Sequence, residues 1–305
     1  MRKINDMMDH TDISSMKQNS LYELSKEKHI QKFLKENHLN VDMMDDYWVE
    51  FLDYNDDYHI CLHCSSLNDC PKDNKGMKKS LVVHDDQIVL ELSSCVYGKE
   101  LEKRRLLLNQ FVISNVSDEL MLTDLKGLNI IKNLQKASPN CKYAVASVLK
   151  YIQQPEYLGL FLHGDIESEK TLLLAGLMNS LAKQNKEVGF IHFPTYLIDL
   201  KASFSSGENT HAIDRLMSVE YLMLDGIGEE NITPWSRDEI LLTILSYRLI
   251  NQLPTFFTSM YGYKELENVY TIKKSDSGDK IRAKTIIQKM KALSNEIMLD
   301  GGKMK

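Results

Sequence analysis

Hydrophobic residues in the second half of the chain fall in short continuous runs separated by stretches with helical spacing. The runs that read as buried strands are residues 158–162, 188–193, 221–224 and 254–259. Apolar residues three and four positions apart follow them, and Pro155, Pro194 and Pro234 mark helix boundaries. Continuous apolar strands alternating with helices are typical of a parallel sheet covered on both faces. The pattern therefore predicts an α/β domain over residues 137–305.

The first half has a different pattern. Two amphipathic helices are predicted, the first from Ser20 to near Asn37 and the second carrying Val41, Met44, Trp48, Phe51 and Leu52 on one side. We interpret this apolar side as packing within its own domain, with a partner-docking face as the alternative. Apolar residues 81–83 and 88–90 flank a polar turn and predict a hairpin. We expect a small α+β domain over residues 1–106 and a charged connector over 107–136.

Cysteines are concentrated in the predicted N-terminal domain. A CxxC pair is followed by two more cysteines, one after the hairpin, and these four residues are Cys61, Cys64, Cys70 and Cys95. A CxxC pair that meets ligands from a later strand is a common way to build a structural zinc site. We predict such a site here, with His63 and His84 as reserve ligands. The alternative is a set of buried thiols with a chance CxxC.

Composition limits the classes of partner and compartment. The chain has 305 residues, a formal net charge of −6, 43% hydrophobic and 26% charged residues. This balance excludes a sequence-independent coat for nucleic acid, so any DNA contact has to be local. No apolar run approaches the roughly 20 residues of a membrane span, and the first residues lack the apolar core of a signal peptide. We expect a cytoplasmic protein without a membrane partner, whose cysteines are thiols or metal ligands.

The first strand of the α/β domain leads into a polar loop, Gly164–Thr171, and then a helix. A strand, a loop ending in Lys-Thr and a helix are the layout of a phosphate-binding loop, in which backbone N–H groups hold phosphates. Gly164, Lys170 and Thr171 are therefore candidate nucleotide-binding residues. The pattern G-x-x-x-x-G-K-[ST] has a second glycine where this chain has Glu169.

Several later segments carry a family resemblance: LMLDGIGEE at 222–230, ITPW at 232–235, RDE at 237–239, YR at 247–248 and LPTFFTS at 253–259. They resemble the DnaI family of primosomal helicase loaders, AAA+ proteins of the same clade as DnaC. The cysteine cluster is similar to that family's N-terminal zinc domain, so the resemblance covers most of the chain. It implies a protein that binds the hexameric replicative helicase through its N-terminal domain. Delivery of the helicase to single-stranded DNA would use the C-terminal domain.

The resemblance also implies that Asp225 holds Mg²⁺, and it identifies departures from the family pattern. Glu169 would bring a negative charge beside the β-phosphate, at a cost of about 4 kcal/mol at 4 Å and an effective dielectric near 20. A glutamate that turns outward would escape most of that cost, so we expect weakened rather than abolished nucleotide binding. The other departures lie where the family has a second acid, a polar sensor and two arginines, at Gly226, Met260, Thr285 and Lys289. Arg282 is a partial substitute for one arginine. The family's histidine zinc ligand falls at Lys78, which leaves Cys70 to complete a four-cysteine site.

Losses around one site in a chain whose strands still read cleanly indicate a fold that was kept while hydrolysis was lost. We assign no catalytic residue and expect an adaptor with zinc, and with ATP or ADP and Mg²⁺ as candidate ligands. Other primosome proteins are expected partners, and self-association is left open. The alternatives are an active ATP-dependent loader and a diverged antagonist of the loading system. Scattered lysines offer no stacking platform for DNA, so no DNA-binding residue is assigned.

Overall fold

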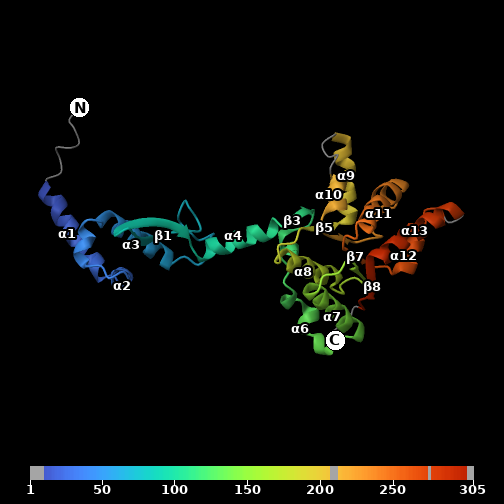
Figure 1. Ribbon diagram of the computed structural model, residues 1–305, viewed down its shortest axis with the longest axis horizontal. Coiled ribbons are helices and arrows are strands. Elements are labelled where there is room, and N and C mark those ends of the chain that lie inside the picture. The colour runs from blue at the N-terminus through green and yellow to red at the C-terminus, as the bar shows by residue number, and fades with distance from the viewer. Residues whose placement is uncertain (1–9, 207–211, 274–275, 301–305) are drawn as a thin grey trace. The chain divides into compact units, whose positions relative to one another are not determined.

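The computed structural model describes residues 10–206, 212–273 and 276–300. The chain divides into two units, with the boundary between Arg104 and Arg105 (Figure 1). The predicted boundary at residue 106 lies two positions further along. Each unit has its own hydrophobic core. None of the helices in the described ranges is long and apolar enough to cross a membrane.

The N-terminal unit packs helices against a two-stranded hairpin. Its elements are α1 (His10–Lys26), α2 (Lys28–Glu36), η2 (Val41–Asp45), α3 (Trp48–Leu62), β1 (Met77–His84) and β2 (Gln87–Ser94), followed by α4 (Val96–Leu108). Its core contains Leu24, Ile30, Leu34, Met44, Phe51, Leu81 and Ile88. Most of the predicted apolar side of the helices is therefore turned inward, as expected for packing within the domain. Val41 is the exception, with 52% of its surface exposed.

The predicted first helix is divided in two. Glu27 adopts an extended backbone conformation between α1 and α2, which interrupts the helical hydrogen bonds. The hairpin is antiparallel with His84 opposite Gln87, as the apolar runs indicated. Asp85 and Asp86 both have positive φ, 48° and 62°. Two consecutive left-handed residues match the twist of paired strands, which explains the tight connection.

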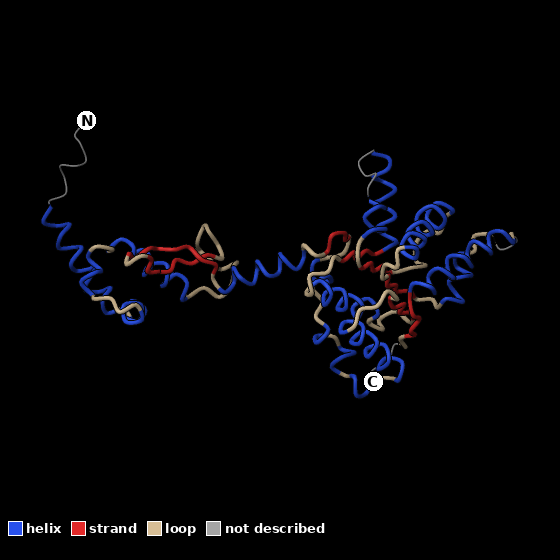
Figure 2. The backbone as a smooth tube through the Cα atoms, in the orientation of Figure 1, coloured by secondary structure: helices blue, strands red, loops and turns tan. Residues whose placement is uncertain are grey.

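The C-terminal unit is built on a six-stranded parallel sheet in the order β3-β5-β6-β7-β4-β8. Its strands are β3 (Phe111–Ser114), β4 (Gly159–His163), β5 (Val188–His192), β6 (Tyr221–Asp225), β7 (Thr255–Ser259) and β8 (Ser294–Met298). Figure 2 shows these strands in red between helices on both sides. The predicted parallel sheet with helices on both faces is confirmed. The four central strands are almost wholly buried, as continuous apolar strands require.

Two hydrophobic clusters cover the two faces of the sheet. The first is formed mainly with α7 (Pro139–Gln153) and α8 (Lys170–Ala182), beside the short elements α5 (Asp118–Met121), η3 (Leu125–Gly127), α6 (Asn129–Lys132) and η4 (Leu134–Lys136). The second involves α9 (Phe193–Ser206), α10 (Ala212–Ser218), η5 (Trp235–Leu241), α11 (Leu242–Ile250), α12 (Tyr263–Tyr270) and α13 (Ser277–Leu293). The phosphate-loop helix α8 therefore lies between the sheet and the short elements.

The segment interpreted as a connector, residues 107–136, contributes to this unit. Within it, β3 pairs in parallel with β5 at the edge of the sheet. Leu125 and Ile130 are buried in the first cluster. Leu125 also lies against Gly176 of α8, where a Cβ would come within 2.4 Å of its side chain. Strand β3 has only four residues, and one of their side chains is buried, so its hydrophobic pattern in the sequence is weak.

Arg248 of α11 links three segments by hydrogen bonds: the end of α10, the residues before β6 and the start of β7. It is fully buried and donates hydrogen bonds to the carbonyls of residues 216, 217, 219, 220 and 254 and to Thr255 Oγ1. Burial lowers the pKa of its guanidinium to about 9. The arginine satisfies carbonyls at the end of α10 and before β6 and β7, so it links these three segments to α11.

Candidate functional site

The predicted nucleotide-binding residues converge at the carboxyl ends of β4 and β6, the two strands that flank β7. Gly164 follows β4, Lys170 and Thr171 begin α8, and Asp225 ends β6. Gly164 has φ +142°, and a Cβ there would lie 2.1 Å from the carbonyl oxygen of Leu299. No other residue fits this position without a backbone shift. Ligands of open α/β sheets bind at this edge, so the site lies where the topology favours it.

Lys170 folds back over its own loop. Its Nζ donates to the carbonyl oxygen of Asp165 at 2.5 Å and to Ser168 Oγ at 3.0 Å. Burial lowers the pKa of Lys170, and the carboxylates of Glu229, Asp165 and Asp225 oppose this shift. The ammonium therefore lies in the loop where a phosphate would be cradled, held by contacts that a phosphate could replace.

Asp225 is linked to Thr171. Asp225 Oδ1 accepts from Thr171 Oγ1 at 2.7 Å and from Thr258 Oγ1 at 2.6 Å. Thr258 Oγ1 in turn accepts from the N–H of Gly226 at 3.0 Å. A hydroxyl at the start of the helix next to a carboxylate at the end of a strand is a donor set suited to Mg²⁺, which prefers oxygen ligands and retains several waters.

Glu169 does not direct its carboxylate at the phosphate position. Glu169 Oε2 accepts a hydrogen bond of 2.8 Å from the N–H of Ile130, in the first turn of α6. Its backbone is left-handed, with φ 60°. The expected charge clash with a phosphate is therefore relieved by an outward-turned side chain. The sequence could not show this because residues 130 and 169 are far apart in the chain.

The backbone conformation at the position after Asp225 favours glycine. Gly226 has φ +76°, and a Cβ would lie 3.1 Å from His192 Nε2. A second acid at this position would need both a strained backbone and movement of the histidine. Glu230 is also unable to act as a substitute, because its oxygens accept from Tyr270 Oη at 2.7 Å and from the Gly228 N–H at 2.7 Å. Glu229 is a further acid near Lys170, beside Asp165 and Asp225.

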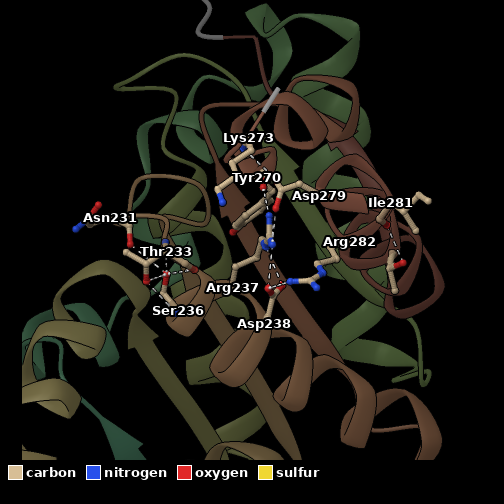
Figure 3. A network of polar contacts seen from close by, with 11 residues as sticks. Asn231, Thr233, Ser236, Arg237, Asp238, Tyr270, Lys273, Asp279, Ile281 and Arg282 are labelled. Carbon is tan, nitrogen blue, oxygen red and sulfur yellow. Dashed lines mark hydrogen bonds and ion pairs between the residues drawn. The ribbon is translucent and has the colours of Figure 1, made fainter. Parts of the chain in front are cut away.

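A buried arginine organises the region between η5 and α13 (Figure 3). Arg237 is bidentate with Asp238 at 2.7 and 2.9 Å, and it pairs with Asp279 Oδ1 at 2.9 Å. Its Nη1 donates to the carbonyl oxygen of Tyr270 at 2.8 Å. Arg237 lowers the pKa of Asp279 to about 2. This network holds α13 against η5.

The positions where the family has arginines lie on α13. Thr285 Oγ1 donates to the carbonyl oxygen of Ile281 within the helix. Arg282, the partial substitute, is 64% exposed and lies 3.4 Å from Asp238 Oδ2. Figure 3 shows its guanidinium directed at this carboxylate. Arg282 is therefore an outer member of the Arg237 network in this chain.

The cysteines gather without forming a metal-binding group. The backbone N–H of Lys72 lowers the pKa of Cys70, and the Gly76 N–H adds to this effect against burial. Burial raises the pKa of Cys64, as does its neighbour Cys70. Cys95 Sγ accepts from the Gly98 N–H at 3.4 Å. Over the described ranges, no group of three or more histidine, cysteine, aspartate or glutamate side chains is placed to hold a metal ion. The predicted set of zinc ligands is therefore not assembled among the described residues, and the zinc site stays a prediction.

Lys72 is a residue of this region that the sequence pattern did not indicate. Its Nζ lies 2.5 Å from Asp57 Oδ1 and 3.0 Å from Cys61 Sγ. Burial disfavours its charge, but the bonds to Asp57 and Cys61 outweigh it and raise the pKa of the ammonium. The available sequence signal was the spacing of Asp57 and Cys61, which are one helical turn apart on α3.

Comparison with known proteins agrees with this architecture. Residues 1–91 match the family model for the N-terminus of the primosomal protein DnaI. The replicative helicase loader DnaI of Bacillus subtilis strain 168 is 26% identical over 278 residues, which are 90% of this chain and 89% of that protein. The resemblance to DnaI is confirmed.

Solved structures of DnaI type also match this chain. A Streptococcus pyogenes serotype M3 protein described as a primosome component is 26% identical with a TM-score of 0.54, covering 67% of this chain and 100% of that one. A crystal structure of DnaI is 27% identical with a TM-score of 0.54, covering 61% and 97% respectively. The similarity to DnaI thus extends from the N-terminal family match to the parallel α/β unit that carries the phosphate loop.

Proposed function

We propose that this chain is a helicase-loader-type adaptor of DNA replication. Its N-terminal unit binds a replicative helicase, and its C-terminal AAA+-type unit helps to place that helicase on single-stranded DNA. The single observation that carries the proposal is the similarity to the Bacillus subtilis helicase loader over 90% of this chain, including the N-terminal family match. Sequence similarity over both units favours a shared role more strongly than a shared α/β fold would.

Nucleotide is proposed to bind with little or no hydrolysis. Support for binding comes from Lys170, the Thr171–Asp225 pair and the outward-turned Glu169. Support for weak hydrolysis comes from Gly226, which supplies no side chain to orient a water, and from Met260 at the sensor position. A phosphoryl group would then be held without the acid that activates its attacker.

The test measures nucleotide binding and turnover of the full chain, with and without the replicative helicase of the same organism. We expect micromolar-range ADP and ATP binding that Lys170→Ala weakens, turnover close to buffer alone, and helicase binding that survives Lys170→Ala. Turnover on the order of 1 s⁻¹ or faster, abolished by Lys170→Ala, would contradict the hydrolysis proposal. Absence of a complex with the helicase would contradict the adaptor proposal independently.

An active ATP-dependent loader is the second candidate, and one observation favours it. Glu229 is the largest of the carboxylate influences on the Lys170 ammonium, so an acid other than Asp225 is close to the loop. In an active loader of this kind, Glu229 would be the acid that orients the attacking water. The distinguishing variant is Glu229→Gln, which should remove any measured turnover while leaving ADP affinity within about threefold, since it would act on the attacking water rather than on the bound diphosphate.

Single-stranded DNA contact is proposed at a hollow between α9 and residues 229–236. The hollow has a volume of about 460 Å³, and its lining includes Leu197, Ile198, Lys201 and Trp235. An indole and an ammonium on one concave surface suit a stacked base and its phosphate. We expect Trp235→Ala to weaken binding of a fluorescent oligonucleotide by about tenfold. Equal affinity of the Trp235→Ala variant and the parent for the oligonucleotide would contradict DNA binding at this hollow.

A further inference from the structure

Glu230 is a buried carboxylate in the loop that follows Asp225 at the end of β6. The residue is 8% exposed. Its Oε1 accepts from Tyr270 Oη and its Oε2 accepts from the backbone N–H of Gly228, both at 2.7 Å. Burial raises the pKa of Glu230, and the hydrogen bonds from Tyr270 and Gly228 oppose this shift. The Tyr270 hydroxyl therefore supports the ionised form of a buried carboxylate close to the phosphate loop.

The same loop is closely packed, and it carries Glu229. Gly228 has φ +90°, and a Cβ there would lie 2.6 Å from a leucine side chain of α12. The N–H of Glu229 donates to the carbonyl oxygen of Gly226 at 3.1 Å, which closes a turn. Glu230 holds this turn from its far end, because its carboxylate binds the Gly228 N–H. The position of Glu229 is therefore tied to that of Glu230.

Tyr270 is itself held in place. It ends α12 and is fully buried, and its carbonyl oxygen accepts from Arg237 Nη1 at 2.8 Å (Figure 3). Arg237 pairs in turn with Asp279 of α13 at 2.9 Å. The tyrosine therefore connects the loop after β6 to η5 and α13, and its hydroxyl is a fixed donor for Glu230.

Glu229 lies near a positive charge that a nucleotide needs. Burial lowers the pKa of Lys170, and Glu229 is the carboxylate that opposes this shift most, without a hydrogen bond between these two described side chains. Lys170 Nζ donates instead to oxygens of Asp165 and Ser168 in its own loop. A carboxylate in direct contact with the ammonium would compete with a phosphate for it. Tight nucleotide binding therefore requires that Glu229 stay out of contact with Lys170.

We propose that Tyr270 is a positioning residue of the nucleotide site. Through Glu230 it holds the loop so that Glu229 stays clear of Lys170, and this role rests on the nucleotide binding proposed above. Without the hydroxyl, the Glu230 carboxylate loses one of its two donors, and it lines the hollow beside α9 into which it can turn. The Gly228 N–H is then released, and Glu229 is free to pair with the Lys170 ammonium.

The first experiment compares two tyrosine-to-phenylalanine variants of α12 by titration of the full chain with ADP. Tyr270→Phe removes the hydroxyl that binds Glu230 and keeps the ring. Tyr263→Phe is the matched control, because Tyr263 is also buried and its hydroxyl bonds to Ser294 at the amino end of β8, away from the phosphate loop. We expect ADP affinity to fall about tenfold in Tyr270→Phe and to stay within about twofold in Tyr263→Phe. Melting curves establish that both variants are folded.

A double variant separates positioning from a general loss of stability. Glu229→Gln removes the charge that would compete with the phosphate, because an amide forms no ion pair with Lys170. In a Glu229→Gln background, the loss of ADP affinity caused by Tyr270→Phe should shrink from about tenfold to within about twofold. A loss that came from destabilisation would be the same in both backgrounds.

The outcomes distinguish this proposal from the one on which it rests. A parent chain that binds no ADP would contradict nucleotide binding and the positioning role together. ADP binding by the parent with equal affinity in Tyr270→Phe would overturn the positioning role alone. An equal loss in Tyr263→Phe, or a loss in Tyr270→Phe that persists undiminished beside Glu229→Gln, would overturn it as well.

Discussion

Glu169 adopts a left-handed backbone at the entrance to α8, with φ 60°. A non-glycine residue in this conformation costs on the order of 1 kcal/mol or more, and the hydrogen bond to the Ile130 N–H offsets it. The side chain thus links the phosphate loop to α6. At the scale of single residues, the consequence is that the acid need not oppose nucleotide binding.

A charge-neutral variant tests this directly. A carboxylate beside a phosphate would cost about 4 kcal/mol, so its removal would raise affinity by about a thousandfold. Because the carboxylate accepts a hydrogen bond from the Ile130 N–H and does not face the phosphate position, we expect Glu169→Gln to change ADP affinity by less than about tenfold. Glu167→Gln, an exposed acid of the same loop, is the control. Isothermal titration provides the measurement, and a thousandfold gain for Glu169→Gln alone would show that the carboxylate reaches the phosphates.

Ion pairs of Arg237 with Asp238 and Asp279 attach α13 to η5. Because one partner is a carboxylate with a lowered pKa, the stability that this attachment contributes decreases at low pH. The pKa of Asp279 is about 2 in the fold, against an ordinary value of 3.8. A carboxylate with a depressed pKa contributes stability that is fully present above its unfolded pKa and is lost as the pH falls through its folded one. The contribution of Asp279 is therefore lost between about pH 4 and pH 2.

We expect Asp279→Asn to destabilise the C-terminal unit at pH 7 and to flatten its loss of stability between pH 4 and pH 2. Glu239→Gln changes an exposed acid of η5 and should follow the parent. Urea unfolding at a series of pH values measures both effects. If Asp279→Asn and the parent lost stability in parallel over that range, the ion pair would not be the cause.

Arg248 gives a second prediction at the scale of elements. Six oxygens accept from its guanidinium, and a lysine has only three donors. Arg248→Lys should lower the free energy of unfolding by about 2–4 kcal/mol, because buried carbonyls lose their donors. Arg282→Lys, at a side chain that is 64% exposed, should stay within about 0.5 kcal/mol. Equal stability of the two variants in urea would contradict the role assigned to Arg248.

The elements differ in how well the local sequence predicted them. Strands β4, β5, β6 and β7 were predicted because buried parallel strands are continuously apolar. Strand β3 was missed because an edge strand of four residues leaves a weak pattern. The break at Glu27 was also missed, since two short helices share one apolar side and only the backbone at that residue separates them.

At the scale of the whole molecule, the chain consists of two units with separate cores. Separate cores imply that each unit holds its own fold, and the proposed function divides between them in the same way. The N-terminal unit carries the family match at residues 1–91, and the C-terminal unit carries the phosphate loop. Removal of one unit should therefore separate helicase binding from nucleotide binding.

We expect a fragment of residues 105–305 to bind ADP within about threefold of the full chain, because the nucleotide residues and both of their hydrophobic clusters lie within it. The same fragment should lose binding to the replicative helicase. Circular dichroism establishes that the fragment is folded, and titration with ADP and a helicase pull-down measure the two activities. Retained helicase binding would assign that contact to the C-terminal unit.

The sequence by itself determined the parallel sheet, the hairpin, the position of the phosphate loop and the resemblance to DnaI. These depend on periodicity and on short motifs, which are properties of neighbouring residues. The tertiary structure decided the roles of Glu169 and Lys72, since each depends on a partner brought close only by folding, Ile130 in one case and Asp57 in the other. The local sequence determines which chemical groups a segment carries. The fold determines which of these groups come into contact, and those contacts determine what a site can bind.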